Sequence, residues 1–195
     1  MTDLAEGRGI ETRVYEAAED SHLLARAAVT RAERGDLVLD VGTGSGYVAA
    51  TVAETTGARV IGSDLNPHAC RRAREAGVEA VHADLLAPFR DGAFDLVVFN
   101  PPYLPTAEDE ERDDWMERAL SGGESGREVV DPFLDTVRRV LAPDGTVLLL
   151  VSSLTGIDAV RDRARDDGLT TRVVSEESFP FERLVVLSLR PTGSH

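Results

Sequence analysis

The tetrapeptide Asn100-Pro101-Pro102-Tyr103 directly follows an apolar run at 94–99 and brings together groups that could hold a planar NH2 group. Two consecutive prolines lack backbone N–H groups and restrict φ, so the Pro101 carbonyl would have a fixed direction. The Asn100 side-chain oxygen is a second acceptor, and Tyr103 offers an aromatic face. Two acceptors can take both N–H protons while the lone pair points elsewhere, which favours methylation at nitrogen. The alternative is a turn that only ends a strand.

A glycine-rich segment joins the apolar run 37–41 to a predicted helix, and its members are Asp40, Gly42, Thr43, Gly44 and Gly46. Glycines let a backbone approach a ligand closely, and a helix N-terminus presents free N–H groups. The spacing differs from the dinucleotide fingerprint G-x-G-x-x-G, and no Lys-Ser/Thr pair of a phosphate-binding P-loop follows. The segment therefore predicts a nucleotide-type pocket of another kind.

Two further acids each end a predicted strand. Asp64 follows the run 59–63, where a carboxylate can accept both hydroxyls of a ribose. Asp84 follows 79–83, and with Leu85 beside it could meet an adenine amine and ring. Alternatively, Asp64 is only a helix cap, because a helical run follows it. Acids at three successive strand ends favour the ligand-binding interpretation.

Alternating strand and helix patterns predict an α/β domain with a parallel sheet covered by helices. Strands are expected at 36–41, 58–63, 78–83, 94–99, 145–151, 170–178 and 183–190, and helices at 19–34, 46–56, 67–76, 127–142 and 156–167. The last two strands are expected to form an antiparallel pair at one edge. Parallel strands that end together would gather the polar residues described above at one edge of the sheet.

The order of these motifs resembles that of Rossmann-like class I S-adenosylmethionine-dependent methyltransferases, which have a seven-stranded, mostly parallel sheet with helices on both faces. More narrowly, the segment 14–21 is similar to the N-terminal signature of the HemK-like release-factor glutamine methyltransferases, in their short archaeal and eukaryotic form. Ala17 stands where that signature usually has proline, which should loosen the turn but leaves the acids in place. The segment 121–129 resembles the family's glycine-rich segment after the catalytic loop, and the resemblance spans 14–151.

The resemblance implies S-adenosylmethionine as cofactor, no metal, and N5-methylation of the glutamine in the Gly-Gly-Gln motif of a peptide chain release factor. The implied catalytic residues are Asn100, Pro101, Pro102 and Tyr103. The implied cofactor-binding residues are Glu19, Asp20, Asp40, Gly42, Thr43, Gly44, Gly46, Asp64, Leu65, Asp84, Leu85 and Asn100. It also implies a heterodimer with a small zinc-binding activator subunit, which would add a strand at the edge near 78–83.

An amide nitrogen is a poor nucleophile, so the expected mechanism relies on positioning by Asn100 and the Pro101 carbonyl. Three alternatives stay open at this point. An N6-adenine methyltransferase acting on RNA or DNA could use the same tetrapeptide, because adenine also presents an exocyclic NH2 group. A protein lysine methyltransferase would first have to deprotonate an ammonium group. A cofactor-binding subunit without catalysis would not need Asn100.

The composition is strongly acidic, with 35 Asp and Glu residues against 21 basic residues, a net charge of −14 and no lysine. Such a surface repels itself unless salt screens it, and at ~1 M salt the Debye length falls to about 3 Å. This indicates a halophile, with an acidic protein from a GC-rich bacterium as the alternative. Direct nucleic-acid binding is disfavoured, because it needs a basic surface.

The length of 195 residues predicts a single methyltransferase domain. Within it we expect an N-terminal extension at 1–18, an acidic substrate loop or lid at 105–127, and a flexible tail at 191–195. Cys70 is the only cysteine, so no disulfide within the chain is possible. A signal peptide and an apolar run of membrane-spanning length are both missing from the sequence, which predicts a cytoplasmic protein without a membrane partner.

Overall fold

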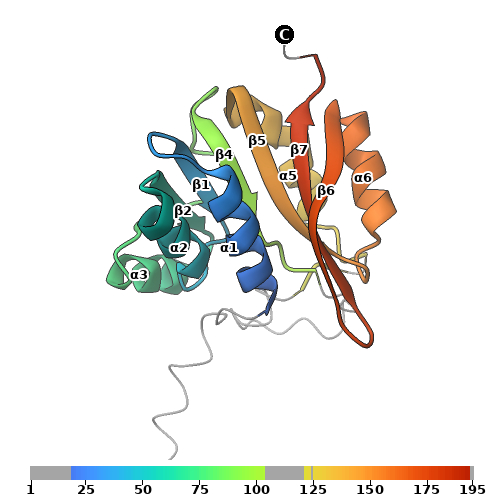
Figure 1. Ribbon diagram of the computed structural model, residues 1–195, viewed down its shortest axis with the longest axis horizontal. Helices are drawn as coiled ribbons and strands as arrows, with labels where there is room; N and C mark the ends of the chain where they lie inside the picture. Colours follow the sequence, from blue (N-terminus) through green and yellow to red (C-terminus); the bar gives the residue numbers. More distant parts are fainter. Residues whose placement is uncertain (1–18, 104–120, 124, 194–195) are drawn as a thin grey trace, which may run out of the picture.

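The computed structural model describes residues 19–103, 121–123 and 125–193. Its seven-stranded sheet has the order β3-β2-β1-β4-β5-β7-β6 and is covered by helices on both faces (Figure 1). The strands are β1 (Leu37–Val41), β2 (Arg59–Asp64), β3 (Glu79–His82), β4 (Phe94–Phe99), β5 (Leu141–Ser152), β6 (Leu169–Ser178) and β7 (Arg183–Pro191). The helices are α1 (Glu19–Arg31), α2 (Tyr47–Thr56), α3 (Pro67–Glu75), α5 (Val130–Val140) and α6 (Ile157–Asp166).

The predicted α/β class, seven strands and antiparallel pair at one edge are confirmed, since β7 runs antiparallel to both β5 and β6. The signature segment 14–18, the acidic loop at 105–120 and residues 194–195 lie outside the described residues. The tail boundary predicted at 191 is too early. Strand β7 includes Pro191, and the Thr192 N–H donates to the Gly168 carbonyl at 2.9 Å.

The predicted helix 127–142 is shorter than expected, and the following strand starts earlier. Helix α5 ends at Val140 because Leu141 is already extended, with φ −73 and ψ 134. Leu141 pairs with Phe94, and the ladder then shifts register before it continues from Leu96 and Thr146. Gly145 permits this irregularity, because a Cβ there would lie 2.7 Å from the Phe94 carbonyl oxygen.

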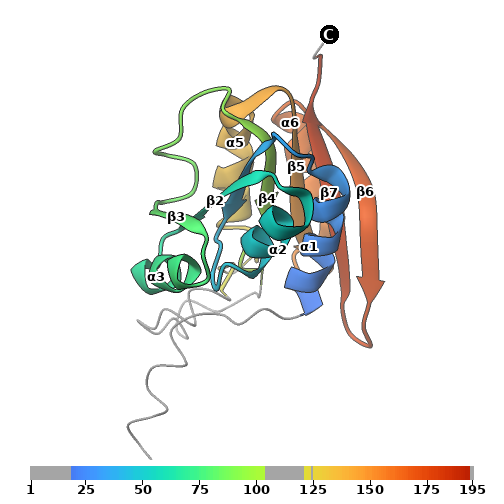
Figure 2. The same cartoon turned by 60° about the vertical axis from the view of Figure 1, so that its left-hand side comes forward.

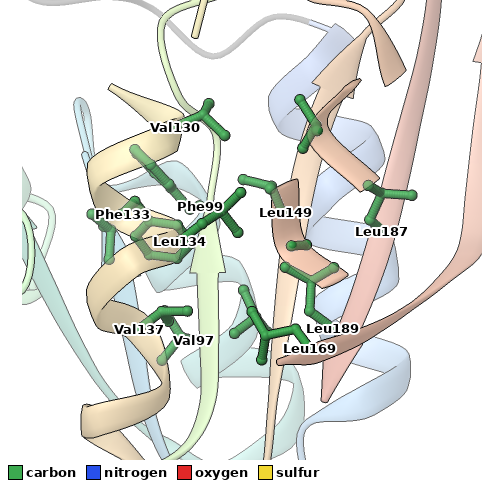
Figure 3. Packing of buried hydrophobic residues seen from close by; sticks show 14 of the residues in the cluster. Val97, Phe99, Val130, Phe133, Leu134, Val137, Leu149, Leu169, Leu187 and Leu189 are labelled. Carbon is green, nitrogen blue, oxygen red and sulfur yellow. The ribbon is translucent and has the colours of Figure 1, made fainter. Parts of the chain in front are cut away.

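Two hydrophobic clusters lie on opposite faces of the sheet. Alternate residues of the central strands point to opposite sides, so Phe99 and Leu149 pack under α5, whereas Val98 and Leu148 pack under α1 and α2. The rings of Phe99 and Phe133 have centroids 4.7 Å apart at the centre of the first cluster (Figure 3). Burial of both faces explains why these strands read as continuous apolar runs.

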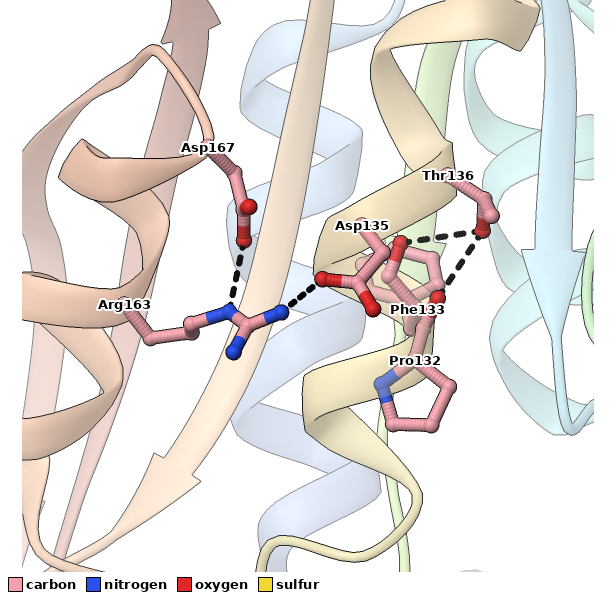
Figure 4. A network of polar contacts seen from close by, with 6 residues as sticks. All are labelled: Pro132, Phe133, Asp135, Thr136, Arg163 and Asp167. Carbon is pink, nitrogen blue, oxygen red and sulfur yellow. Dashed lines mark hydrogen bonds and ion pairs between the residues drawn. The ribbon is translucent and has the colours of Figure 1, made fainter.

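Helices α5 and α6 are joined on the surface by one arginine. Arg163 of α6 forms an ion pair with Asp135 of α5, and its Nε donates to Asp167 at 2.9 Å (Figure 4). The guanidinium is partly exposed, so solvent screens both ion pairs and each adds little to stability. Arg163 therefore links α5 to α6 on the surface, and it contributes little to the stability of the fold.

The fold brings three distant segments to one end of the molecule. The start of α1, the end of β4 and the tip of the hairpin between β6 and β7 all lie at the lower end in Figure 1. Figure 2 shows that β3 and β6 form the two edges of the sheet. Within the described residues, no helix is both long and apolar enough to cross a bilayer.

Candidate functional site

The neighbouring strands β1 and β4 place the glycine segment beside the tetrapeptide. Val41 pairs with Phe99, so Gly42 and Asn100 leave the sheet side by side. Gly42 has φ +63, and a Cβ there would meet the Phe99 ring at 3.4 Å and the Asn100 carbonyl oxygen at 3.9 Å. The strand order reverses between β1 and β4, and the crevice at the carboxyl ends of such strands is where α/β folds bind ligands.

Buried polar side chains support the glycine segment on the side that faces the sheet. The Thr43 hydroxyl donates to Asp40 Oδ2 at 2.7 Å, and both side chains are buried. Gly62 leaves room for this arrangement, since a Cβ there would lie 2.8 Å from Thr43 Oγ1. The Asp40 and Thr43 side chains therefore face each other beneath the loop and shape it, while their predicted cofactor contacts stay a prediction.

Burial raises the pKa of the Asp40 carboxyl to about 7, against the opposing hydrogen bond from Thr43. The same carboxyl would titrate near 4 in the unfolded chain. Between these two values the folded state holds a proton that the unfolded state has lost. The contribution of this group to stability is therefore present below pH ~4 and is lost as pH rises to about 7.

We expect Asp40→Asn to remove this pH dependence. When pH rises from 4.5 to 7.5, the free energy of unfolding should fall in the wild type by on the order of 1–3 kcal/mol more than in the variant. Chemical denaturation of both proteins at constant salt measures the difference. Asp166→Asn, at an exposed position of α6, controls for the loss of one negative charge. A pH dependence that is the same in wild type and Asp40→Asn would contradict the protonation of Asp40.

Asp64 ends β2 and binds the glycine segment directly. Its Oδ2 accepts from the Gly44 N–H at 2.9 Å, and its Oδ1 accepts from the Asn66 N–H at 2.8 Å. Burial raises the pKa of Asp64, and these two N–H groups oppose the shift. The helix-cap alternative is wrong, because Asn66 is the N-cap of α3 and accepts from the His68 N–H at 2.9 Å.

Three further residues predicted to bind the cofactor, Leu65, Asp84 and Leu85, follow the ends of β2 and β3. Asp84 and Leu65 are exposed, and Leu85 is half-buried against the cluster under α5. Leu85 has φ +45, the only positive value among the described residues other than glycine. A branched side chain in this region costs about 1–2 kcal/mol, and such strain is concentrated at ligand sites. The strain agrees with a role for Leu85 at the pocket.

The tetrapeptide lies against the start of α1. Asn100 Nδ2 donates to Asp20 Oδ2 at 3.1 Å, although the two residues are 80 positions apart. Asn100 Oδ1 is buried and has no hydrogen-bond partner among the described residues. Pro101 is buried, and Pro102 and Tyr103 are half-buried. The arrangement leaves one buried acceptor open, which is costly unless a ligand supplies the donor.

Thr155, which sequence reasoning missed, links the tetrapeptide to the glycine-rich segment at 121–128. Its hydroxyl is 3.5 Å from the Tyr103 carbonyl oxygen, and its own carbonyl accepts from Arg127 Nη1 at 3.0 Å. Gly122 is required in this segment, because a Cβ would lie 2.7 Å from the Gly126 backbone. Thr155 follows β5 without any motif around it, so no sequence signal could have indicated this link.

Comparison with known proteins gives consistent results. A family model described as a methyltransferase domain matches residues 38–122. A Methanocaldococcus jannaschii protein with the provisional name protein N5-glutamine methyltransferase is 34% identical over 185 residues, which cover 92% of each chain. The human methyltransferase HEMK2 is 37% identical over 195 residues, covering 93% of this chain and 91% of its own. The chain belongs to the short form of the HemK-like glutamine methyltransferases.

A solved structure agrees with this assignment. The E. cuniculi complex of Mtq2 with Trm112, described as responsible for methylating the translation termination factor eRF1, contains a chain that superposes with a TM-score of 0.76. It is 30% identical and matches 92% of this chain and 99% of its own. This methyltransferase therefore uses S-adenosylmethionine. The residues at the ends of β1 to β3 fit that group, because its hydroxyls and adenine amine are donors and Asp64 and Asp84 are acceptors.

A cavity opens beside the tetrapeptide of this methyltransferase. It measures about 520 Å³ and is lined by Glu19, Asp20, His22, Tyr103, Phe179, Pro180, Phe181, Glu182 and Leu184. Phe181, at the hairpin tip, is 95% exposed, although an aromatic side chain normally packs or binds a partner. Phe179 and Phe181 lie in the turn between β6 and β7, where polar residues are usual, and these two aromatic residues were the signal for a site that sequence reasoning did not use. Among the described residues, no cluster of His, Cys, Asp and Glu could hold a metal.

Proposed function

We propose that this enzyme methylates the side-chain nitrogen of the glutamine in the Gly-Gly-Gln motif of a peptide chain release factor. The observation that carries the proposal is Asn100 Oδ1, a buried acceptor that has no partner among the described residues, next to two rigid prolines. A primary amide supplies the missing donor and presents its nitrogen in a fixed direction. The eRF1 methylation named for the E. cuniculi complex supports the same substrate.

Positioning accounts for the chemistry. Asn100 Oδ1 and the Pro101 carbonyl accept the two N–H protons of the substrate amide, and Tyr103 packs on the amide plane. When bound, the cofactor would supply a methyl group on a sulfonium, which a neutral nitrogen can accept while the sulfur leaves as a neutral thioether. As the N–CH3 bond forms and the S–CH3 bond breaks, the nitrogen becomes acidic and releases one N–H proton to water. Good orientation of this kind can lower a barrier by ~7–11 kcal/mol.

The residues around the adenosyl group are part of the proposal. The backbone of Gly42 and Gly44 is accessible and would approach the cofactor together with that of Gly46, which packs against Ala73, and Asp64 would accept the ribose hydroxyls. Each oxygen of Asp64 already accepts one N–H and retains a further lone pair for a hydroxyl. Asp84 and Leu85 would meet the adenine, with Leu65 near by, whereas Glu19 and Asp20 lie beside the tetrapeptide at the other end of the site.

The cavity beside Tyr103 favours a polypeptide as the substrate. Its lining combines carboxylates with aromatic rings, so it suits a basic or aromatic peptide segment that flanks the glutamine. The same carboxylates would repel the phosphates of RNA or DNA, which disfavours the adenine alternative.

The function is tested by incubating the protein, cofactor and a haloarchaeal release factor in high salt, followed by mass spectrometry of the Gly-Gly-Gln peptide. We expect a single added methyl group on glutamine, and none on a release factor in which that glutamine is replaced by alanine. Equal methylation of both substrates would contradict the proposal, as would methylation of tRNA or rRNA in parallel reactions with no product on the release factor.

We expect Phe181→Ser to raise KM for the release factor by ~10-fold, because a large aromatic contact at an interface is worth about 1–2 kcal/mol. The exposed position of Phe181 means that stability should change little. Steady-state kinetics with varied release factor measures the effect. Val173→Ser, also on the hairpin and exposed, serves as the control. An unchanged KM for the release factor would show that the substrate does not contact Phe181.

We further propose that a small zinc-binding activator pairs with the edge of the sheet near 78–83. The Ala83 N–H donates to the Asp64 carbonyl of β2. Because successive residues point to opposite sides, the Ala80 N–H and carbonyl point to the open edge. Val81 is 38% exposed there. The complex of Mtq2 with Trm112 supports the proposal.

The Ala80 carbonyl oxygen, which is the outward-pointing acceptor of this edge, already accepts hydrogen bonds within the chain. Arg74 of α3 donates to the Ala80 carbonyl from Nε at 3.1 Å and from Nη2 at 2.7 Å. A partner strand would have to displace this guanidinium. We therefore expect Ala80→Pro and Val81→Glu to abolish copurification with the activator, and Arg74→Ala to preserve or strengthen it. Val174→Glu, on the opposite edge strand β6, is the matched control. Intact copurification of Val81→Glu and Ala80→Pro would contradict pairing at β3.

A further inference from the structure

We infer that Asp20 is a positioning residue that fixes the side-chain amide of Asn100 with its oxygen toward the substrate; the inference rests on the proposed function. Asp20 is the second residue of α1 and is only 4% exposed. Its Oδ2 accepts from Asn100 Nδ2 at 3.1 Å, and its Oδ1 accepts from the Ser21 N–H at 2.6 Å. The carboxylate is thus held by its own helix and directed at β4.

An asparagine amide has a donor end and an acceptor end of nearly the same shape, so its chemistry depends on which end faces the substrate. A carboxylate can only accept, and it selects the orientation in which Nδ2 faces Asp20. The opposite atom, Asn100 Oδ1, then points away from Asp20 and is the buried acceptor without a partner among the described residues. Without Asp20 the amide could turn over and present N–H groups to the N–H groups of a substrate amide.

The contact also strengthens the acceptor. Hydrogen bonds in a chain polarise one another, so donation from Nδ2 to a carboxylate increases the negative charge on Asn100 Oδ1. Such an oxygen holds a substrate N–H more firmly as the nitrogen becomes positive. This role differs from the cofactor contact predicted for Asp20, because Asp20 here acts through the Asn100 side chain and not on the cofactor.

A double-mutant cycle tests the assignment. Asp20→Ala should lower kcat by ~10- to 100-fold with an unchanged cofactor Kd, since small misplacement of a reacting group can cost about 100-fold. In the Asn100→Ala background the same change should lower kcat by less than about twofold, because coupled residues are not additive. Asp20→Asn retains an acceptor and should recover part of the rate. Glu33→Gln, exposed near the end of α1, is the control.

Equal losses in both backgrounds would overturn the inference, and so would a weakened cofactor Kd with a normal rate per bound cofactor. A second readout does not depend on the substrate. The side-chain NH2 of Asn100, identified by its absence in Asn100→Ala, should exchange slowly with solvent in the wild type and faster in Asp20→Ala. Slow exchange that persists in Asp20→Ala would refute the role of Asp20. Absence of methyl transfer to the release factor, with exchange as expected, would refute only the proposed function.

Discussion

Replacement of Asn100 by alanine should lower kcat by ~100-fold or more while the cofactor Kd stays within about twofold. The reason is that one oriented hydrogen-bonding group in a transition state is worth about 3–4 kcal/mol, and Asn100 Oδ1 is the buried acceptor left open in the structure. Calorimetry gives the cofactor Kd, and single-turnover kinetics at saturating cofactor gives the chemical step.

The Asn100 variant has an internal control in Asn66, which has the same side chain but caps α3. Asn66→Asp retains a capping oxygen and should retain the rate. If Asn100→Ala instead lost cofactor affinity and kept its rate per bound cofactor, Asn100 would belong to the cofactor pocket and the acceptor assignment would be wrong.

Removal of the Asp64 carboxylate should weaken cofactor binding by ~2–3 kcal/mol, because two ribose hydroxyls lose a charged acceptor. We expect a raised cofactor KM for Asp64→Ala with a smaller change in kcat. The structure adds a second contribution, since Asp64 also accepts from the Gly44 N–H and thereby shapes the glycine segment.

Asp64→Asn separates the two contributions. It keeps one acceptor oxygen, which can hold either Gly44 or Asn66, but it loses the charge that favours the ribose hydroxyls. Chemical denaturation without cofactor reports on the loop alone, and calorimetry reports on binding. Unchanged cofactor affinity in both variants would limit Asp64 to a structural role.

The outline of the fold could be predicted because each buried strand is a short apolar run that ends at a polar residue. Asp64 is the last residue of β2 and Asn100 directly follows β4, whereas Asp40 lies one residue before the end of β1. The alternation of residues on β5, with Leu148 and Leu149 in different clusters, follows from strand geometry in the same way.

Side-chain pairing at the site could not be predicted. Asp20 is one of two acids in the first turn of α1, and a favourable helix dipole explains such acids equally well. Only the packing of α1 against the sheet directs Asp20 rather than Glu19 at Asn100. The same holds for Thr155 and for Asp40, whose burial beneath the loop depends on the space left by Gly62.

The hydrogen bonds between Arg74 and the Ala80 carbonyl also bear on how the open edge of the sheet associates with other chains. An open edge strand invites another copy to join it, and proteins often protect such edges with charged side chains. Arg74 occupies the outward acceptor from within the same chain, through an exposed side chain that can swing away. Arg74 thus protects this edge against a strand from another copy, because any strand that joins β3 has to displace the guanidinium from the Ala80 carbonyl.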